Sequence, residues 1–110
     1  MGQGMLPKKN RADKKLVEKI FKEGRFINSP SLTLKFVNKE TTTPRLSFVV
    51  PKKIEKRAVK RNFLKRQGYL ILEKYFKKLP NGFSGVFVFK KNISVLEIEN
   101  EIKSILNKIN

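Results

Sequence analysis

The sequence predicts an α+β fold, a two-layer sandwich of three helices on a small mixed sheet of about four strands. Apolar residues recur at helical spacing in the longer segments and alternate with polar residues in several shorter ones. The two kinds of segment are interspersed in the order α-β-β-β-α-β-α. The chain has 110 residues, of which 39% are hydrophobic, so residues 1–110 are expected to form a single domain around one core.

The segment 13–23, DKKLVEKIFKE, is expected to form the first helix, because its apolar residues recur at helical spacing. Asp13 is the expected N-cap, since its carboxylate can accept hydrogen bonds from free backbone amides. Gly24 follows and is expected to end the helix in the left-handed conformation. Residues 1–11 are expected to be flexible, and residues 1–4, MGQG, are either native or a remnant of expression.

Shorter segments predict the strands. The segment 25–28 is a brief strand, and 32–36 alternates apolar with polar residues, as a strand with one buried face does. A polar turn, NKETTTP, leads to a third strand at 45–51. The segment 86–90, VFVFK, is a continuous apolar run and is therefore expected to be buried on both faces.

Two more helices complete the fold. The segment 55–77 predicts a long basic helix, which makes a β-α-β unit with the strands on either side and favours their parallel pairing. The segment 95–108 predicts the last helix, and its acidic residues lie in the first half, where they complement the helix dipole. Its expected core residues are Leu96, Ile98, Ile102, Ile105, Leu106 and Ile109.

The charge of the chain points to a polyanionic partner. Lys and Arg number 26 against 9 for Asp and Glu, which gives a net charge of +17. Such a field attracts polyanions, with nucleic acid as the first candidate and an anionic membrane surface as the second. The absence of cysteine excludes disulfides and thiolate metal sites. No apolar run is long enough for a spanning helix and no secretory signal is recognisable, so a cytoplasmic protein is expected.

The stretch KRAVKRNFLKRQGY, residues 56–69, carries most of this argument because it is rich in Lys and Arg and contains no acidic residue. On a helical wheel, Val59, Phe63 and Leu70 lie close together and are expected to face the sheet. The opposite side is expected to carry a row of basic residues at steps of four, Arg57, Arg61 and Lys65, flanked by Lys60 and Asn62.

This basic row allows three interpretations. A solvated face kept for solubility usually mixes both signs, whereas like charges four apart repel with no acidic residue to offset them. A membrane-surface helix would need the apolar side that the small core also needs. Arginine is suited to phosphate because its planar fork makes bidentate contacts, and the amide of Asn62 can both donate and accept. Folded RNA is favoured over duplex DNA, since no helix-turn-helix or zinc-finger spacing is present.

The block SFVVPKKIEKRAVKRNFLKR, residues 47–66, resembles the signature of the protein subunit of bacterial ribonuclease P. In that family a strand ending in a Lys-Lys pair leads into a helix with Ala-x-x-Arg-Asn-x-x-Lys-Arg. The stretches LPKKNR and IFKEGR, and the late apolar strand, also have counterparts there. Where the family usually has Arg-Asn-Arg, this chain has Arg61-Asn62-Phe63.

The resemblance implies a fold like that of domain 2 of ribosomal protein S5, and a protein that is monomeric and does not bind membranes. It implies that the chain pairs with a catalytic RNA and helps to remove the 5′ leader of precursor tRNA. The RNA would carry out the Mg²⁺-dependent hydrolysis, with no cofactor or metal held by protein side chains alone. The absence of His and Cys agrees with a protein that is not itself catalytic.

The resemblance also assigns two surfaces. The residues expected to contact the catalytic RNA are Lys52, Lys53, Arg57, Lys60, Arg61, Asn62, Lys65 and Arg66. The residues expected near the single-stranded leader are Lys8, Lys9, Arg11, Val17, Phe21, Lys35 and Phe36. For Phe21 and Phe36, an ordinary place in the core is an equal alternative. The rival functions are a structural RNA-binding protein such as a ribosomal protein, an autonomous nuclease and a membrane-active cationic protein.

Overall fold

A mixed four-stranded sheet organises the protein in a computed structural model that describes residues 14–37, 44–79 and 82–109. The elements in chain order are α1 (Lys14–Glu23), β1 (Arg25–Asn28), β2 (Leu32–Val37), β3 (Arg45–Val49), α2 (Ala58–Tyr75), the 3₁₀ turn η2 (Phe76–Lys78), β4 (Ser84–Phe89) and α3 (Val95–Ile109). The expected α+β fold and its element order are confirmed. The strand order is β1-β2-β4-β3, and only the β3–β4 pair is parallel, as the β-α-β pattern predicts.

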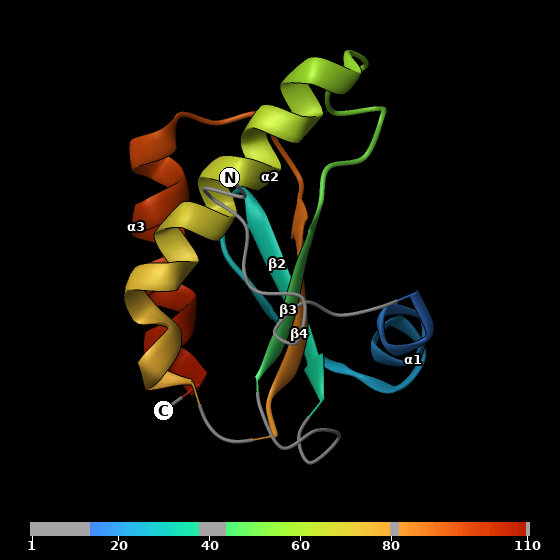
Figure 1. The fold of residues 1–110 in the computed structure, drawn as a ribbon, viewed down its shortest axis with the longest axis vertical. Coiled ribbons are helices and arrows are strands. Elements are labelled where there is room, and N and C mark those ends of the chain that lie inside the picture. Colours follow the sequence, from blue (N-terminus) through green and yellow to red (C-terminus); the bar gives the residue numbers. More distant parts are fainter. Residues whose placement is uncertain (1–13, 38–43, 80–81, 110) are drawn as a thin grey trace.

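The helices lie on both faces of this sheet. Helices α2 and α3 lie side by side on one face, and α1 lies on the other (Figure 1). The main core fills the layer between the sheet and the α2–α3 pair, and α1 adds a smaller contact through the buried Ile20. The first turns of α2 project past the end of the sheet (Figure 1). This overhang places the basic half of α2 away from the core.

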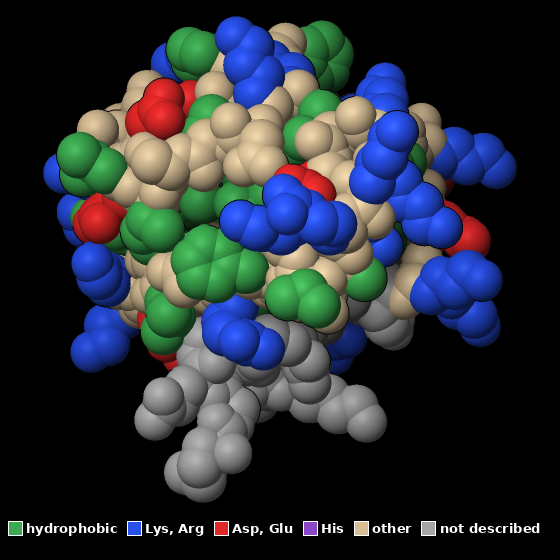
Figure 2. Space-filling model, turned by 90° about the horizontal axis from the view of Figure 1, so that it is seen from above, with side chains coloured by type: hydrophobic (Ala, Val, Ile, Leu, Met, Phe, Trp, Pro, Cys, Tyr) green, Lys and Arg blue, Asp and Glu red, His purple; other side chains and the backbone are tan. Residues whose placement is uncertain are grey.

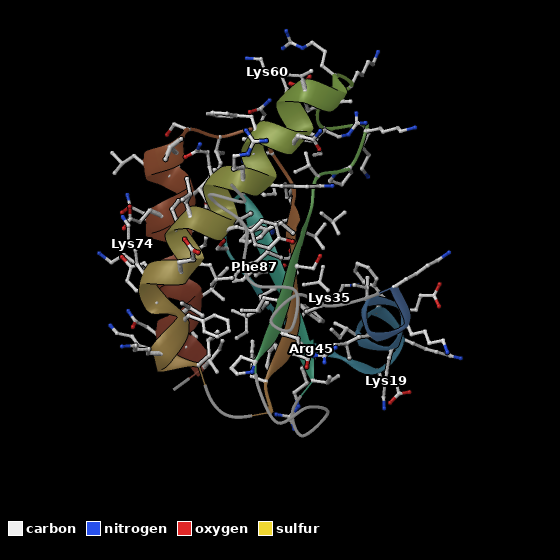
Figure 3. All side chains as sticks on the ribbon, viewed as in Figure 1. Lys19, Lys35, Arg45, Lys60, Lys74 and Phe87 are labelled. Atoms are coloured by element: carbon white, nitrogen blue, oxygen red, sulfur yellow. The ribbon has the colours of Figure 1, made fainter. Side chains whose placement is uncertain are left out.

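Strand register explains the core. Phe87 of β4 pairs with Leu34 of β2 on one side and with Phe48 of β3 on the other, and all three are buried. The rings of Phe48 and Phe87 stack with their centroids 5.0 Å apart. Phe87 points from the sheet toward α2 (Figure 3). Its neighbour Val86 points to the other face of the sheet, the α1 side, and is also buried. The prediction that this strand is buried on both faces is confirmed.

The basic helix starts three residues later than the expected 55–77. The amides of Ile54 and Glu55 both donate to the carbonyl of Pro51, so the chain makes a turn before it becomes helical. Glu55 then uses its carboxylate to accept from the backbone amide of Arg57, 3.0 Å away. The helix therefore begins at Ala58, and the sequence pattern alone did not separate this turn from the helix.

The predicted orientation of this helix is wrong. Val59, Phe63 and Leu70, expected to face the sheet, are 80%, 46% and 38% exposed. The buried side is instead formed by Leu64, Gly68, Tyr69, Ile71 and Leu72. The reason is Gly68, because a Cβ atom there would come within 2.6 Å of the Phe48 ring, so only glycine lets the helix approach this closely. The helix carries two apolar rows, and the row that contains the glycine faces the sheet.

Two further expectations need correction. Leu96 is 70% exposed, whereas the other expected core residues of α3 are buried or packed against the core. The Ser94 and Glu97 side chains cap the start of α3, with the Ser94 amide donating to Glu97 and the Glu97 amide donating to the Ser94 hydroxyl.

Gly24 does not adopt the left-handed conformation, which among the glycines of the described ranges is found at Gly82. Glycine is needed at 24 for space, since a Cβ there would lie 2.9 Å from the Phe36 carbonyl oxygen. The expected N-cap Asp13 and the expected flexible start lie outside the described residues.

Candidate nucleic-acid interface

The residues expected to bind the catalytic RNA lie on the first half of α2 and on the turn before it. We call this set the basic α2 surface: Lys52, Lys53, Arg57, Lys60, Arg61, Asn62, Lys65 and Arg66. Arg61 and Lys65 are half-buried, and the other members are exposed. Seen from this end of the molecule, lysine and arginine side chains surround apolar ones (Figure 2). The fold therefore gathers these cations in one place.

One acidic residue lies inside this surface and was missed by the sequence argument. Glu55 is only 8% exposed. One carboxylate oxygen accepts from the amide and the Nε of Arg57, at 3.0 and 3.1 Å, and the other accepts from the Asn92 amide group at 3.0 Å. The hydrogen bond from Arg57 is the main reason that the pKa of Glu55 lies below its ordinary value. The expectation that the basic row has no acidic partner is therefore wrong at Arg57.

Arg61 is held by the same turn. Its Nη1 donates to the carbonyl oxygens of Glu55 and Lys56, at 3.0 and 2.8 Å. These bonds hold the guanidinium of Arg61 against the start of α2. The other N–H groups of the guanidinium take no part in these two bonds. The first turn of α2 has no acidic residue and no side-chain cap, so its free amides add positive potential at the same place.

Two cations also border a hollow beside the free edge of β3. The hollow is open to solvent and has a volume of about 300 Å³. It is lined by Ser47, Phe48, Asn62, Lys65, Arg66 and Tyr69. The Tyr69 hydroxyl accepts from the backbone amide of Phe48, 3.3 Å away, which satisfies an edge group of β3. The donors and the hydroxyl of this lining suit a sugar–phosphate segment, because phosphate oxygens accept and ribose hydroxyls both donate and accept.

A second surface lies between α1 and the sheet. Phe21 of α1 is 42% exposed, and the Nζ of Lys35 in β2 lies 4.9 Å from the centre of its ring. Figure 3 shows Lys35 on the α1 side of the sheet. Val17 of α1 is half-buried. The structure thus brings Phe21 and Lys35 together, as an aromatic face beside a cation.

Phe36 does not belong to this second surface. It follows Lys35 in β2, so its side chain points to the opposite face, and its ring stacks on Phe83 with the centroids 5.3 Å apart. The core alternative therefore holds for Phe36. The expected leader residues Lys8, Lys9 and Arg11 lie outside the described residues.

Arg45 is a residue of this second surface that the sequence argument missed. It starts β3, and it pairs in register with Ser84 of β4. Leu46 and Phe48 point into the core, so Arg45 points toward the α1 side, where Figure 3 places it. Its buried Nε and the buried hydroxyl of Ser84 have no hydrogen-bond partner within the described part of the chain. The alternation of β3 could have revealed this orientation.

The acidic residues of α3 serve the fold and do not form a cluster. Glu97 caps α3, Glu99 accepts from Lys74 and Tyr75 of α2, and Glu101 accepts from the Ser29 hydroxyl and the Ser31 amide. Burial alone would raise the pKa of Glu101, but the hydrogen bonds from the β1–β2 turn outweigh it and lower the pKa. Within the ranges that the structure describes, no three His, Cys, Asp or Glu residues could hold a metal ion together.

Comparison with protein-family models decides the identity of the chain, because residues 6–110 match the model described as Ribonuclease P. The chain belongs to the ribonuclease P family. The expected family is thus confirmed, and with it the role of this family in processing the 5′ leader of tRNA as part of a ribonucleoprotein. An RNA partner in the holoenzyme follows from the same membership.

Solved ribonuclease P proteins share the fold. The RNase P protein from Thermotoga maritima has a TM-score of 0.79 and 24% sequence identity, over 91% of this chain and 97% of that one. A Staphylococcus aureus RNase P protein mutant has a TM-score of 0.80 and 23% identity, over 93% of this chain and 89% of that one. A search of curated protein sequences finds no match. None of the helices in the described ranges is long and apolar enough to cross a membrane.

Proposed function

We propose that this chain binds the catalytic RNA of ribonuclease P through the basic α2 surface and the 5′ leader of precursor tRNA through the surface between α1 and the sheet. The observation that carries the first part is the gathering of cations on the first half of α2 and on the turn before it. Exposed cations on one rigid element neutralise phosphates at fixed positions, and each neutralised phosphate releases counterions. Of the rival functions, a ribosomal protein would share this charge but is disfavoured by the family match.

The second part is supported by Phe21, Lys35 and Arg45. An exposed aromatic ring can stack on an unpaired base, and cations beside it can follow the backbone of a single strand. Within the described ranges the buried Nε of Arg45 has no hydrogen-bond partner, and the residue as a whole is half-buried, so a shift of its side chain would let a phosphate oxygen accept from the guanidinium. Val17, one helical turn before Phe21, is not aromatic, so this surface would hold the leader more through the charges of Lys35 and Arg45 than through stacking.

We further propose that the RNA, and not the protein, carries out the hydrolysis. The chain has neither His nor Cys, and its described acidic residues on α3 are committed to hydrogen bonds within the fold. In this proposal Mg²⁺ belongs to the RNA, and the protein lowers the Mg²⁺ requirement by screening repulsion between RNA segments. The protein acts as a monomer, in the cytoplasm, and without a membrane contact.

Cleavage of a precursor tRNA tests the proposal. A cognate ribonuclease P RNA would be assayed at low Mg²⁺ with the protein, without it, and against protein alone. Cleavage at the mature 5′ end that needs both components is expected. Protein that gives no stimulation, with an RNA that is active at high Mg²⁺, would contradict the proposed partnership. Cleavage by repurified protein alone would contradict catalysis by the RNA.

The leader surface needs its own test. The variants Lys35→Ala and Arg45→Ala should weaken holoenzyme binding to a precursor with a leader, and leave binding of mature tRNA unchanged. Lys103→Ala, which removes an exposed cation of α3, is the matched control. Equal weakening for precursor and mature tRNA would show that these two residues do not contact the leader.

A further inference from the structure

The outward side of α2 carries an apolar row that the fold does not use. Val59, Phe63 and Leu70 lie along this side, and they are 80%, 46% and 38% exposed. The opposite side of the same helix is buried and meets Phe48 of the sheet at Gly68 and Tyr69. Single exposed apolar residues are ordinary, but three lie on one side of this helix, with Arg66 between Phe63 and Leu70. This row therefore has no explanation in the packing of the described chain.

Cations flank the aromatic member of this row. Lys60 precedes Phe63 by one turn and Arg66 follows it by one turn, so both side chains are neighbours of the ring on the same side of the helix. Both are exposed, and Asn62 beside them is exposed too. An aromatic face between two cations is the arrangement that single-stranded nucleic acid uses, with a base on the ring and phosphates on the cations.

The positive charge around this row indicates which kind of partner binds to it. A second copy of the chain would bring its own net charge of +17 against these cations, which opposes pairing of two such surfaces. A lipid surface would bury a broad apolar face, whereas here a narrow row is bordered by Lys60, Arg66 and the polar Asn62. An RNA segment complements both the apolar ring and the positive border.

We propose that Phe63 is a stacking platform for an unpaired base of the bound RNA, with Lys60 and Arg66 holding the phosphates on either side of that nucleotide. This inference rests on the proposed function, since it needs the catalytic RNA as partner. It assigns to Phe63 a stacking contact, which differs in kind from the phosphate contacts of the cations beside it. Stacking on a base adds recognition of shape to a surface whose other contacts depend on charge.

The test compares substitutions of Phe63 in binding to the cognate ribonuclease P RNA at several salt concentrations. Phe63→Leu keeps an apolar side chain and removes the ring, so the affinity should fall by about 10-fold, within the range for loss of one stacked base. Phe63→Tyr keeps the ring and should bind like the unaltered protein. The slope of log K against log salt should be unchanged for both, because no phosphate contact is lost. Ultraviolet cross-linking of the complex should attach a nucleotide at Phe63.

Controls separate this inference from the proposed function. Leu96→Ala removes an exposed apolar residue from α3 and should leave RNA binding unaltered. Arg66→Ala should weaken binding and lower the salt slope. If Phe63→Leu binds as tightly as the unaltered protein while Arg66→Ala does not, the stacking inference is wrong and the RNA-binding function stands. If the unaltered protein fails to bind the RNA, both fail. Loss of self-association on sedimentation in Phe63→Leu, with RNA affinity kept, would identify a second copy as the occupant and overturn the inference.

Discussion

Helices α2 and α3 lie side by side on the same face of the sheet, yet they use their charged residues in different ways. The acidic residues of α3 are all engaged inside the molecule, at its first turn, at α2 and at the β1–β2 turn. On α2, Lys60 and Arg66 are exposed and belong to no ion pair found in the described ranges. The comparison teaches that the acids of α3 complete the fold, whereas α2 leaves Lys60 and Arg66 exposed for the proposed RNA contact.

The apolar residues divide in the same way. Helix α3 has one apolar side and buries it, apart from Val95 and Leu96 at its start. Helix α2 has two apolar sides and buries only the one that contains Gly68. A second apolar side is costly to leave in water, which is why its position beside the cations suggests use by a partner.

The largest expected effect is on the free energy of unfolding, and it distinguishes the buried side of α2 from its exposed side. Leu64→Ala removes a buried side chain from the core and should lower the free energy of unfolding by about 2–5 kcal/mol. Phe63→Ala, one residue earlier and exposed, should change it by less than about 1 kcal/mol, in the range of surface substitutions. Chemical denaturation of both variants measures the difference. Equal losses would contradict the orientation of α2 described above.

The next effect separates free cations from paired ones on α2. Arg66→Ala should weaken binding to the ribonuclease P RNA by about 1.5–3 kcal/mol, as expected for loss of hydrogen bonds to a charged phosphate. Lys74→Ala removes a cation that is 3.3 Å from Glu99, far along the same helix, and should leave the affinity unchanged. Titration of labelled RNA at moderate salt measures both. Equal weakening by the two variants would mean that the RNA responds to total charge alone.

A smaller effect tests the structural use of acids on α3. Glu101→Gln keeps the shape of the side chain but replaces a charged acceptor by a neutral one, so it should cost about 1 kcal/mol of stability near neutral pH. The folded pKa of Glu101 is lowered, so its contribution is complete above the ordinary value of 4.5 and is lost as the pH falls through the lowered value. The variant should therefore lose less stability than the unaltered protein on acidification. Thermal unfolding at several pH values measures this, and parallel curves would remove Glu101 from the acid response.

The smallest effect concerns the exception on α3. Leu96→Ala should change stability by no more than about 0.5 kcal/mol, because the side chain is 70% exposed. A loss of several kcal/mol in denaturation would restore Leu96 to the core, where its helical spacing had suggested it should lie.

The sequence predicted the fold well because the strands and α3 follow simple periods. Alternation identified β2 and β3, and the apolar run of β4 correctly indicated burial on both faces. The orientation of α2 could not be predicted in this way, since a wheel weighs apolar side chains and gives no weight to Gly68, whose lack of a side chain is what admits the Phe48 ring. The wheel also placed Arg61 on an exposed stripe, whereas its guanidinium donates to the backbone carbonyls of Glu55 and Lys56 in the preceding turn.

The place of the candidate residues in the fold was predictable, but their contacts were not. Spacing placed Lys60, Asn62 and Arg66 on one helix, and the structure leaves them exposed there. Glu55 looked like the first residue of that helix, because nothing local in the sequence links it to Asn92, 37 positions away. Contacts over such distances depend on how the chain returns to itself, and neither period nor motif encodes them.

The strand order has a consequence for how the protein is made. Strand β4 lies between β2 and β3, so these two earlier strands have no neighbour in common until residues 84–89 have been synthesised. The basic helix therefore leaves the ribosome before the sheet that supports it can close. Because closure must wait for pairings between distant parts of the chain, folding is expected to begin late in synthesis and to be slower than in a protein built from local contacts. A nascent chain that ends before β4 would expose its cations on an unfolded segment, where they could meet ribosomal RNA before the proper partner.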